Sequence, residues 1–169
     1  MQVFSWLKKS VLALMLLAGA TSAFASRDIT NRDLQALHGL KAVVLLDPEL
    51  DEAAAAAGVT SALIARRTAV YLRDVGVRVV DDSALAPGDR GAAATLLIQF
   101  GAAKGEARRT DTFVTINVLR EKANEAATQP VYVAQERGLA RGKVTRNYFM
   151  RELDLALNML REDLRRARR

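Results

Sequence analysis

The junction at Gly76 limits the fold of this chain more than any other feature of its sequence. From Ser61 to Val75, apolar residues recur every three or four positions, which is the period of an amphipathic helix. Thr60 is a typical N-cap residue, and Gly76 suits the left-handed conformation in which many helices end. Residues 77–80, Val-Arg-Val-Val, are typical of a strand. The segment therefore predicts a helix that turns directly into a strand and packs on the sheet containing it.

Apolar runs predict further strands on both sides of this helix. Residues 40–46 form a short apolar run that ends at Asp47-Pro48, and such a run is typical of a strand buried on both faces. Short polar joints separate three later runs, which predicts an antiparallel meander: residues 94–102, 113–119 and 131–137. Alternation in the second of these runs predicts two faces, Val114, Ile116 and Val118 on one and Phe113, Thr115, Asn117 and Leu119 on the other.

Two more segments have helical patterns. Five alanines follow Asp51 and Glu52 and end at Gly58, which favours a short helix, although a low-complexity loop would have the same composition. Residues 33–37 favour a helical turn. Residues 146–166 predict a long helix, because one apolar stripe runs along it: Phe149, Leu153, Ala156, Leu157, Leu160 and Leu164.

Taken in order, these elements predict an α+β two-layer sandwich. A strand–helix–strand unit precedes the meander, which gives about five strands in a mixed or antiparallel sheet. The two main helices, residues 61–75 and 146–166, would pack on one face of that sheet. The length of 169 residues, without an internal repeat or boundary, indicates a single domain after the N-terminal segment.

The first 25 residues have the pattern of a cleavable secretory signal peptide. Lys8 and Lys9 precede an apolar run from Val11 to Ala20, and Ala23 and Ala25 have the small-x-small spacing that signal peptidase reads. The apolar run is about half of the roughly 20 residues that a membrane span needs, which disfavours an anchor. The chain has no cysteine, hence no disulfide and no lipid attachment point. We therefore expect residues 26–169 to be a periplasmic domain that does not span the membrane.

The charge of the chain suggests anionic partners, and arginines on the two main helices are the candidate residues. Without Lys8 and Lys9 the formal charge of +6 falls to +4. Nucleic acid is disfavoured as a partner, because export separates the chain from it and aromatic residues are scarce. An envelope protein, an anionic lipid or lipopolysaccharide remains possible, and a solvated helix face would explain the same residues without a function. The candidate residues for binding an anion or a partner are Arg66, Arg67, Arg73, Arg161 and Arg165.

The sequence predicts no catalytic site. His38 is the only histidine, and a triad of His38, Ser83 and Asp82 would lack any known spacing motif. Asp81 and Asp82 are neighbours, so on a strand they would point to opposite faces. We interpret these acids as the end of a strand, and we expect a protein that is not an enzyme.

No cofactor or metal is predicted either. Asp47, Glu49 and Asp51 have the spacing of the first ligands of a calcium loop, but Glu52 stands where that loop requires glycine. We expect them to be loop and helix-start acids. The glycines on either side of Lys104, at positions 101 and 105, do not have the Gly-Lys-Ser/Thr ending of a phosphate loop.

Residues 58–79 resemble a pattern found in small exported bacterial proteins of unknown function. That pattern starts a helix with Gly-Leu-Thr and ends it with Leu-Arg-x-x-Gly-Ile-x-Val. The chain departs from it at Arg67, where those proteins often carry an acid, and in lacking a tryptophan in the last strand. The layout is also similar to TolB amino-terminal-like envelope accessory domains, which implies a scaffold and no activity. The matching residues are Gly58, Thr60, Leu72, Arg73, Gly76, Val77 and Val79.

Three functions are compatible with these patterns. The first is a non-enzymatic envelope protein that binds a protein partner or an anionic envelope component. The second is a small-ligand or lipid binder with a pocket between the sheet and the helices, near Phe113 and Phe149. The third is a hydrolase with an atypical site at Asp81, Asp82 or Ser83, which requires one of these residues to share a pocket with His38. The sequence does not specify an oligomeric state.

Overall fold

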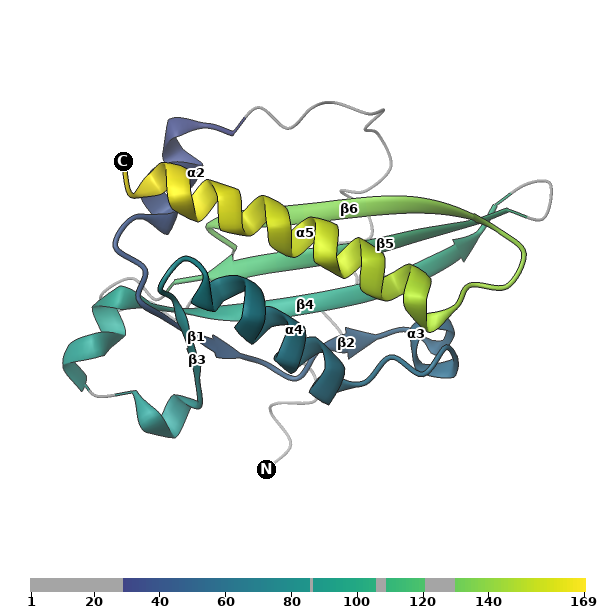
Figure 1. The fold of residues 1–169 in the computed structure, drawn as a ribbon, viewed down its shortest axis with the longest axis horizontal. Coiled ribbons are helices and arrows are strands. Elements are labelled where there is room, and N and C mark those ends of the chain that lie inside the picture. The colour runs from purple at the N-terminus through teal and green to yellow at the C-terminus, as the bar shows by residue number, and fades with distance from the viewer. Residues whose placement is uncertain (1–28, 86, 106–108, 121–129) are drawn as a thin grey trace, which may run out of the picture.

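In the computed structural model, strands and helices form two layers (Figure 1). It describes residues 29–85, 87–105, 109–120 and 130–169, so the predicted signal peptide lies outside the described residues. The elements, in chain order, are α2 (Asn31–Leu37), β1 (Ala42–Leu45), β2 (Glu49–Leu50), α3 (Glu52–Ala56), α4 (Ser61–Arg73), β3 (Arg78–Val80), the 3-10 helices η1 (Asp82–Ala84) and η2 (Pro87–Ala92), β4 (Ala93–Lys104), β5 (Arg109–Leu119), β6 (Tyr132–Arg141) and α5 (Arg146–Ala167).

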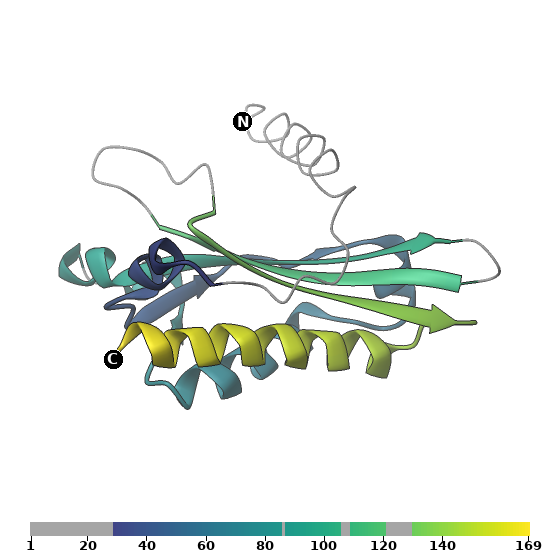
Figure 2. The same cartoon turned by 90° about the horizontal axis from the view of Figure 1, so that it is seen from above.

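The sheet is mixed and has the order β3-β1-β4-β5-β6. β1 is parallel to β3 and to β4, and β4, β5 and β6 form the antiparallel meander. The long helices α4 and α5 lie on the same face of the sheet (Figure 2). The predicted α+β two-layer sandwich is therefore confirmed. We call the face opposite α4 and α5 the second face.

The observed strands differ from the predicted ones in number and length. Pro48 ends β1 as expected, but the chain rejoins the sheet at once, and Glu49 and Leu50 pair with Gln99 and Phe100 as β2. Proline lacks only its own backbone N–H, so it removes one hydrogen bond of the ladder and does not prevent the next residues from pairing. β6 runs on to Arg141, beyond the predicted end, because it is paired residue by residue with β5 along that length. Cross-strand pairing thus outweighs the low strand propensity of Gly138.

Local signals begin α4 at Ser61 as predicted, although the helix ends at Arg73, two residues before the predicted end at Val75. The Thr60 hydroxyl accepts a hydrogen bond from the Leu63 N–H at 3.4 Å, and Gly76 adopts a φ of +66° after α4. The short helix α3 has Asp51 as its N-cap, with a carboxylate oxygen 2.8 Å from the Ala54 N–H. A positive φ strains any residue with a Cβ, so glycine fixes the turn into β3.

The core lies between the helix-covered face of the sheet and the apolar stripes of α4 and α5. The strand residues Val114, Ile116 and Val118 are fully buried, as their alternation predicted. α5 contributes the predicted stripe, and α4 contributes Ile64 and Leu72. The stripe residues are all at most 1% exposed: Phe149, Leu153, Ala156, Leu157, Leu160 and Leu164.

Two arginines attach the first described helix to the rest of the domain. Arg120, just after β5, donates hydrogen bonds to three backbone carbonyls, those of Ala36 at 3.0 Å, His38 at 3.1 Å and Gly91 at 2.7 Å. Arg168, after α5, donates to the Leu40 carbonyl at 3.1 Å. The guanidinium groups thus satisfy carbonyls at the end of α2 and in the connection to β1.

Candidate binding surface

Most of the predicted arginines on α4 and α5 pair with carboxylates that lie on these two helices or at the end of α4. Nε of Arg67 on α4 lies 3.6 Å from the Asp154 carboxylate on α5. Burial raises the pKa of Asp154, and the charge of Arg67 lowers it. This pair therefore joins the two helices rather than presenting a free cation.

Arg161 and Arg165 are also paired. Arg161 lies 3.8 Å from the carboxylate of Asp74 at the end of α4 and 3.1 Å from that of Glu162. The same Glu162 is 2.7 Å from Arg165. The Arg161 guanidinium also lies 5.6 Å from the ring centroid of Tyr71, a cation–π distance. Arg161 is thus held in the seam between α4 and α5.

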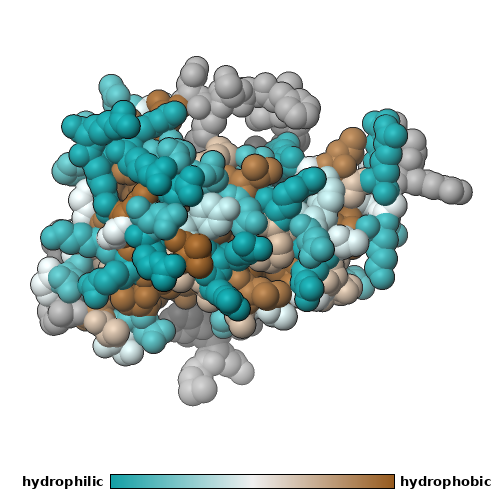
Figure 3. Space-filling model, in the orientation of Figure 1, coloured by the Kyte–Doolittle hydropathy of each residue, from teal (hydrophilic) through white to brown (hydrophobic). Residues whose placement is uncertain are grey.

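Arg66 and Arg73 are the two predicted residues that form no ion pair within the described part of the chain. Both are exposed on α4. The helix-covered side of the molecule is hydrophilic over most of its surface, with apolar side chains between the charged ones (Figure 3). The structure therefore places the five arginines on two helices, with three of them paired and two that form no ion pair with a described residue.

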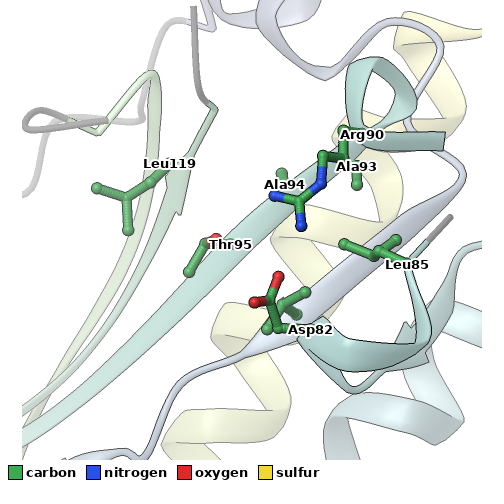
Figure 4. A pocket seen from close by; sticks show the side chains of 8 residues that line it. Asp82, Leu85, Arg90, Ala93, Ala94, Thr95 and Leu119 are labelled. Atoms are coloured by element: carbon green, nitrogen blue, oxygen red, sulfur yellow. The ribbon is translucent and has the colours of Figure 1, made fainter. Parts of the chain in front are cut away.

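The residues of the hydrolase hypothesis are divided between two separate hollows or lie outside both of them. Asp82 on η1 and Arg90 on η2 point into a hollow of about 40 Å³ whose floor is the start of β4 (Figure 4). His38 lines a different hollow, of about 240 Å³, between α2 and the end of α5. Ser83 is exposed beside Asp82 and lines neither of the two hollows. Asp81 also lines neither hollow, so none of Asp81, Asp82 and Ser83 shares one of these two hollows with His38.

Of the acids with the calcium-like spacing, Asp51 begins a helix as predicted, whereas Glu49 lies in strand β2 and not in a loop. Asp51 caps α3 with one carboxylate oxygen and accepts a hydrogen bond from the Ala102 N–H at 2.6 Å with the other. Glu49 accepts from the Gln99 side chain at 2.7 Å, and Gln99 in turn accepts from Asn117 at 2.8 Å. Within the described ranges, no group of three or more His, Cys, Asp and Glu side chains is placed to hold a metal ion.

The predicted pocket near Phe113 and Phe149 is wrong, because the two rings lie on opposite faces of the sheet. Phe149 is fully buried in the core and makes an edge-to-face contact with Phe100, with 6.0 Å between ring centroids. Phe113 lies on the second face, where its ring covers Gly101 so closely that an added Cβ would lie 2.9 Å from Cε2. Side chains alternate between the two faces along β5, and the even-numbered residues face the core, so residue 113 points away from the core.

α5 carries a buried carboxyl group that the sequence analysis did not predict. Glu152 is 2% exposed, and it accepts a hydrogen bond from the Thr112 hydroxyl at 2.6 Å. Its other oxygen is buried without a hydrogen-bond partner among the described residues. Burial raises the pKa of Glu152, and the nearby charge of Glu136 raises it further, against the hydrogen bond from Thr112 and the charge of Arg151. The signal was present, since residue 152 falls within the apolar stripe, one turn from Phe149 and Ala156.

A cluster of positively charged side chains lies on the second face, at the end of the sheet where β5 begins and β6 ends. Arg109 and Arg141 are directly opposite each other across the two strands, and both are exposed. Neither forms an ion pair with a described residue. Arg137 and Leu139 lie on the same face of β6. We call the four residues Arg109, Arg137, Leu139 and Arg141 the basic edge.

The basic edge contains one acidic neighbour and one exposed apolar side chain. Asp111 is exposed and lies opposite Leu139, which is 49% exposed. Three arginines therefore share this part of the second face with one carboxylate and one leucine. Sequence reasoning missed this surface because it ended the last strand at Arg137 and placed Arg109 in the connection between strands.

No family model matches this sequence, and no curated protein matches it. Among solved structures, the chain is similar to the 2.35 Å crystal structure of a minor lipoprotein from Acinetobacter baumannii. The TM-score is 0.40 at 15% sequence identity, over 73% of this chain and 91% of that chain. A likeness of this size says nothing about what this chain binds. Among the described helices, none has the length and apolar character to cross a membrane.

Proposed function

We propose that this chain is a small, non-enzymatic binding module of the cell envelope that engages a protein partner through the basic edge. The export signal expected in residues 1–25 and the resemblance to small exported bacterial proteins support the envelope location. The observation that carries the proposal is the pair Arg109–Arg141. Like charges directly opposite each other destabilise a sheet, so this pair costs stability that a bound anionic group would offset.

The composition of the basic edge favours a protein over a lipid head group or lipopolysaccharide. Leu139 stands between Arg137 and Arg141 on the same face of the strand. Protein interfaces combine arginine with apolar anchors, whereas phosphate groups need only the arginines. Arg66 and Arg73 on α4 offer positive charge but no strand with which a protein segment could pair. An anionic envelope component that binds these two arginines is therefore the alternative ligand.

The acids best suited to chemistry are engaged in the fold, which supports a binding role. Asp51 holds α3 and β4 together, and Glu152 lies in the core. Tyr132 donates a hydrogen bond to the buried carboxylate of Asp163 at 2.7 Å, which fixes α5 on β6. These carboxylates stabilise the scaffold that presents the basic edge.

Site-specific photocrosslinking in living cells tests the proposal with a matched control. Leu139 on β6 is 49% exposed and Leu155 on α5 is 48% exposed, so the same photoreactive residue can be placed at equally accessible positions on the two layers. We expect a discrete protein adduct from position 139 and none from position 155. Adducts from position 155 alone, or from neither position, would contradict the proposal.

A different candidate function, binding of a small anionic ligand, is favoured by the hollow between α2 and α5. Its volume of about 240 Å³ is slightly below that of typical ligand pockets, and Asn31, Gln35, His38 and Arg166 supply polar groups. A thermal-shift screen with carboxylate and phosphate metabolites tests it. A shift abolished by Arg166→Ala would support this candidate, and no shift at millimolar ligand would remove it.

A further inference from the structure

We infer that β6 takes up an extended acidic segment of the partner protein as an additional strand of the sheet. This inference rests on the proposed function and specifies how the basic edge would be occupied. It is carried by three observations on β6: its position in the sheet, the alternation of its side chains, and the charge that those side chains present.

The outer side of the β6 backbone is available toward the basic edge, whereas α2 contacts β6 and lies toward the N-terminal end of the strand (Figure 1). The strand is 10 residues long and is paired with β5 from Tyr132 to Arg141. In the described part of the chain, β6 is the last strand of the sheet order and has no strand on its outer side. A strand at the edge of a sheet presents N–H and C=O groups that can pair with another extended chain.

Alternation along β6 determines which side chains an added strand would meet. Tyr132, Ala134 and Ala140 point into the core. The residues at odd positions therefore point to the second face, and a neighbouring strand places its own side chains about 5 Å from them on that face. From the N-terminal end, these residues are Val133, Gln135, Arg137, Leu139 and Arg141.

These side chains select acids on one face of the incoming strand. Arg137 and Arg141 lie on either side of Leu139, so the complementary strand carries acid, apolar and acid side chains at alternate positions. Arg109 lies beside Arg141 and adds to the positive potential there. On the opposite face of β6, burial raises the pKa of the half-buried Glu136. An acid on that face of the incoming strand would repel Glu136, so the residues of the recognised segment on that face are neutral.

The same charges disfavour a second copy of this chain as the occupant. If two β6 strands paired antiparallel with Leu139 against Leu139, Arg137 of each copy would lie opposite Arg141 of the other. Like charges at directly opposed positions are destabilising, and natural edge strands use such charges against self-association. The basic edge thus excludes its own copy and attracts an acidic strand.

Binding of designed peptides to the purified exported chain tests the inference directly. The probe is an eight-residue peptide in which glutamate and valine take turns at every second position, with threonine at the positions between them, and its counterpart has lysine in place of glutamate. We expect saturable binding of the glutamate peptide alone, weakened by salt. Hydrogen exchange should slow at outward-facing amides of residues 133–141 when that peptide is present, because an added strand protects them.

Paired charge reversals provide the control. The double variant Arg109→Glu, Arg141→Glu should lower the affinity for the glutamate peptide at least tenfold. The double variant Arg66→Glu, Arg73→Glu changes the net charge equally on α4 and should leave the affinity within twofold. Equal losses in both variants would show a general charge effect and overturn the inference.

Other occupants give different results, and each would overturn the inference. Concentration-dependent dimers that dissociate in Leu139→Asp would assign β6 to a second copy. Binding to phosphatidylglycerol vesicles, lost on reversal of Arg109 and Arg141 without any peptide binding, would assign the basic edge to a lipid surface. If the crosslink from position 139 persists while no glutamate peptide binds, the acidic strand is refuted and the proposed function stands. If that crosslink is also absent, both fall.

Discussion

Gly138 on β6 and the carboxyl group of Glu152 on α5 occupy adjoining space, and this contact leads to a quantitative prediction. A Cβ added at Gly138 would lie 2.8 Å from Cδ of Glu152, closer still to Oε1, and 2.8 Å from the Tyr148 hydroxyl. No carbon atom fits at those distances, so Gly138→Ala must displace the Glu152 side chain. That side chain is 2% exposed and is bonded to Thr112 at 2.6 Å, so it cannot move without loss.

The expected cost follows from these contacts. Forcing a methyl group into a packed site costs about 1–3 kcal/mol, and losing the hydrogen bond from Thr112 adds about 1 kcal/mol. Alanine recovers about 0.5–1 kcal/mol of backbone entropy relative to glycine. Gly138→Ala should therefore lower the free energy of unfolding by about 1–3 kcal/mol. In a Glu152→Ala background the main obstacle is gone and only the Tyr148 hydroxyl, at the end of its side chain, must shift, so the same change should cost less than about 1 kcal/mol.

Urea unfolding of the four proteins of this double-mutant cycle, followed by far-UV circular dichroism, measures the coupling. We expect an interaction energy of about 1.5–3 kcal/mol between positions 138 and 152. Gly88→Ala is the matched control, because an added Cβ at Gly88 meets nothing within 4 Å. It should change stability by no more than about 0.5 kcal/mol. Additive effects of Gly138→Ala and Glu152→Ala would refute the packing argument.

Three further predictions concern the polar groups of the fold. Glu152→Gln should gain stability relative to the parent as pH rises above 4.5, the ordinary glutamate pKa. Burial raises the pKa of Glu152 in the folded protein. The parent therefore has the full stabilisation from the bound proton below the unfolded pKa and loses it as pH rises through the folded pKa, whereas the glutamine variant does not titrate. Parallel curves of stability against pH for the two proteins would contradict this prediction. Arg120→Lys should lower the free energy of unfolding in urea by about 1.5–3 kcal/mol, because an ammonium group does not span three carbonyls. Arg90→Lys, at an exposed arginine, is the control, and an equally small loss of stability in both variants would disprove the attachment. Tyr132→Phe should cost about 1–3 kcal/mol by leaving the Asp163 carboxylate without this donor, and an unchanged urea midpoint would argue against it.

Much of the fold could be predicted because its signals are local. The helix from Ser61, its N-cap Thr60 and the turn at Gly76 depend on periodicity and on backbone conformations that few residues adopt. The apolar stripe of α5 likewise determines which side of the helix is buried, because its leucines must face the sheet. Such features need no knowledge of distant residues.

The candidate surface could not be predicted, because it depends on register. The opposition of Arg109 and Arg141 is set by the pairing of β5 with β6, which no local pattern near either residue encodes. Similarly, whether Arg67 is a free cation depends on Asp154, which a different helix brings within 3.6 Å. Sequence reasoning counted charges correctly and had no means of pairing them across the fold.

The attachment of α2 by Arg120 and Arg168 has a consequence for the order in which the domain can be completed. A chain is made from its N-terminus, so α2 is among the first described elements to emerge. The groups that hold it belong to the end of β5 and to the residue that follows α5. Contacts of such long sequence separation form late, because closing a long loop costs entropy. Deleting the last two residues should therefore loosen the first helix rather than the last, as protease cleavage within residues 29–40 would reveal.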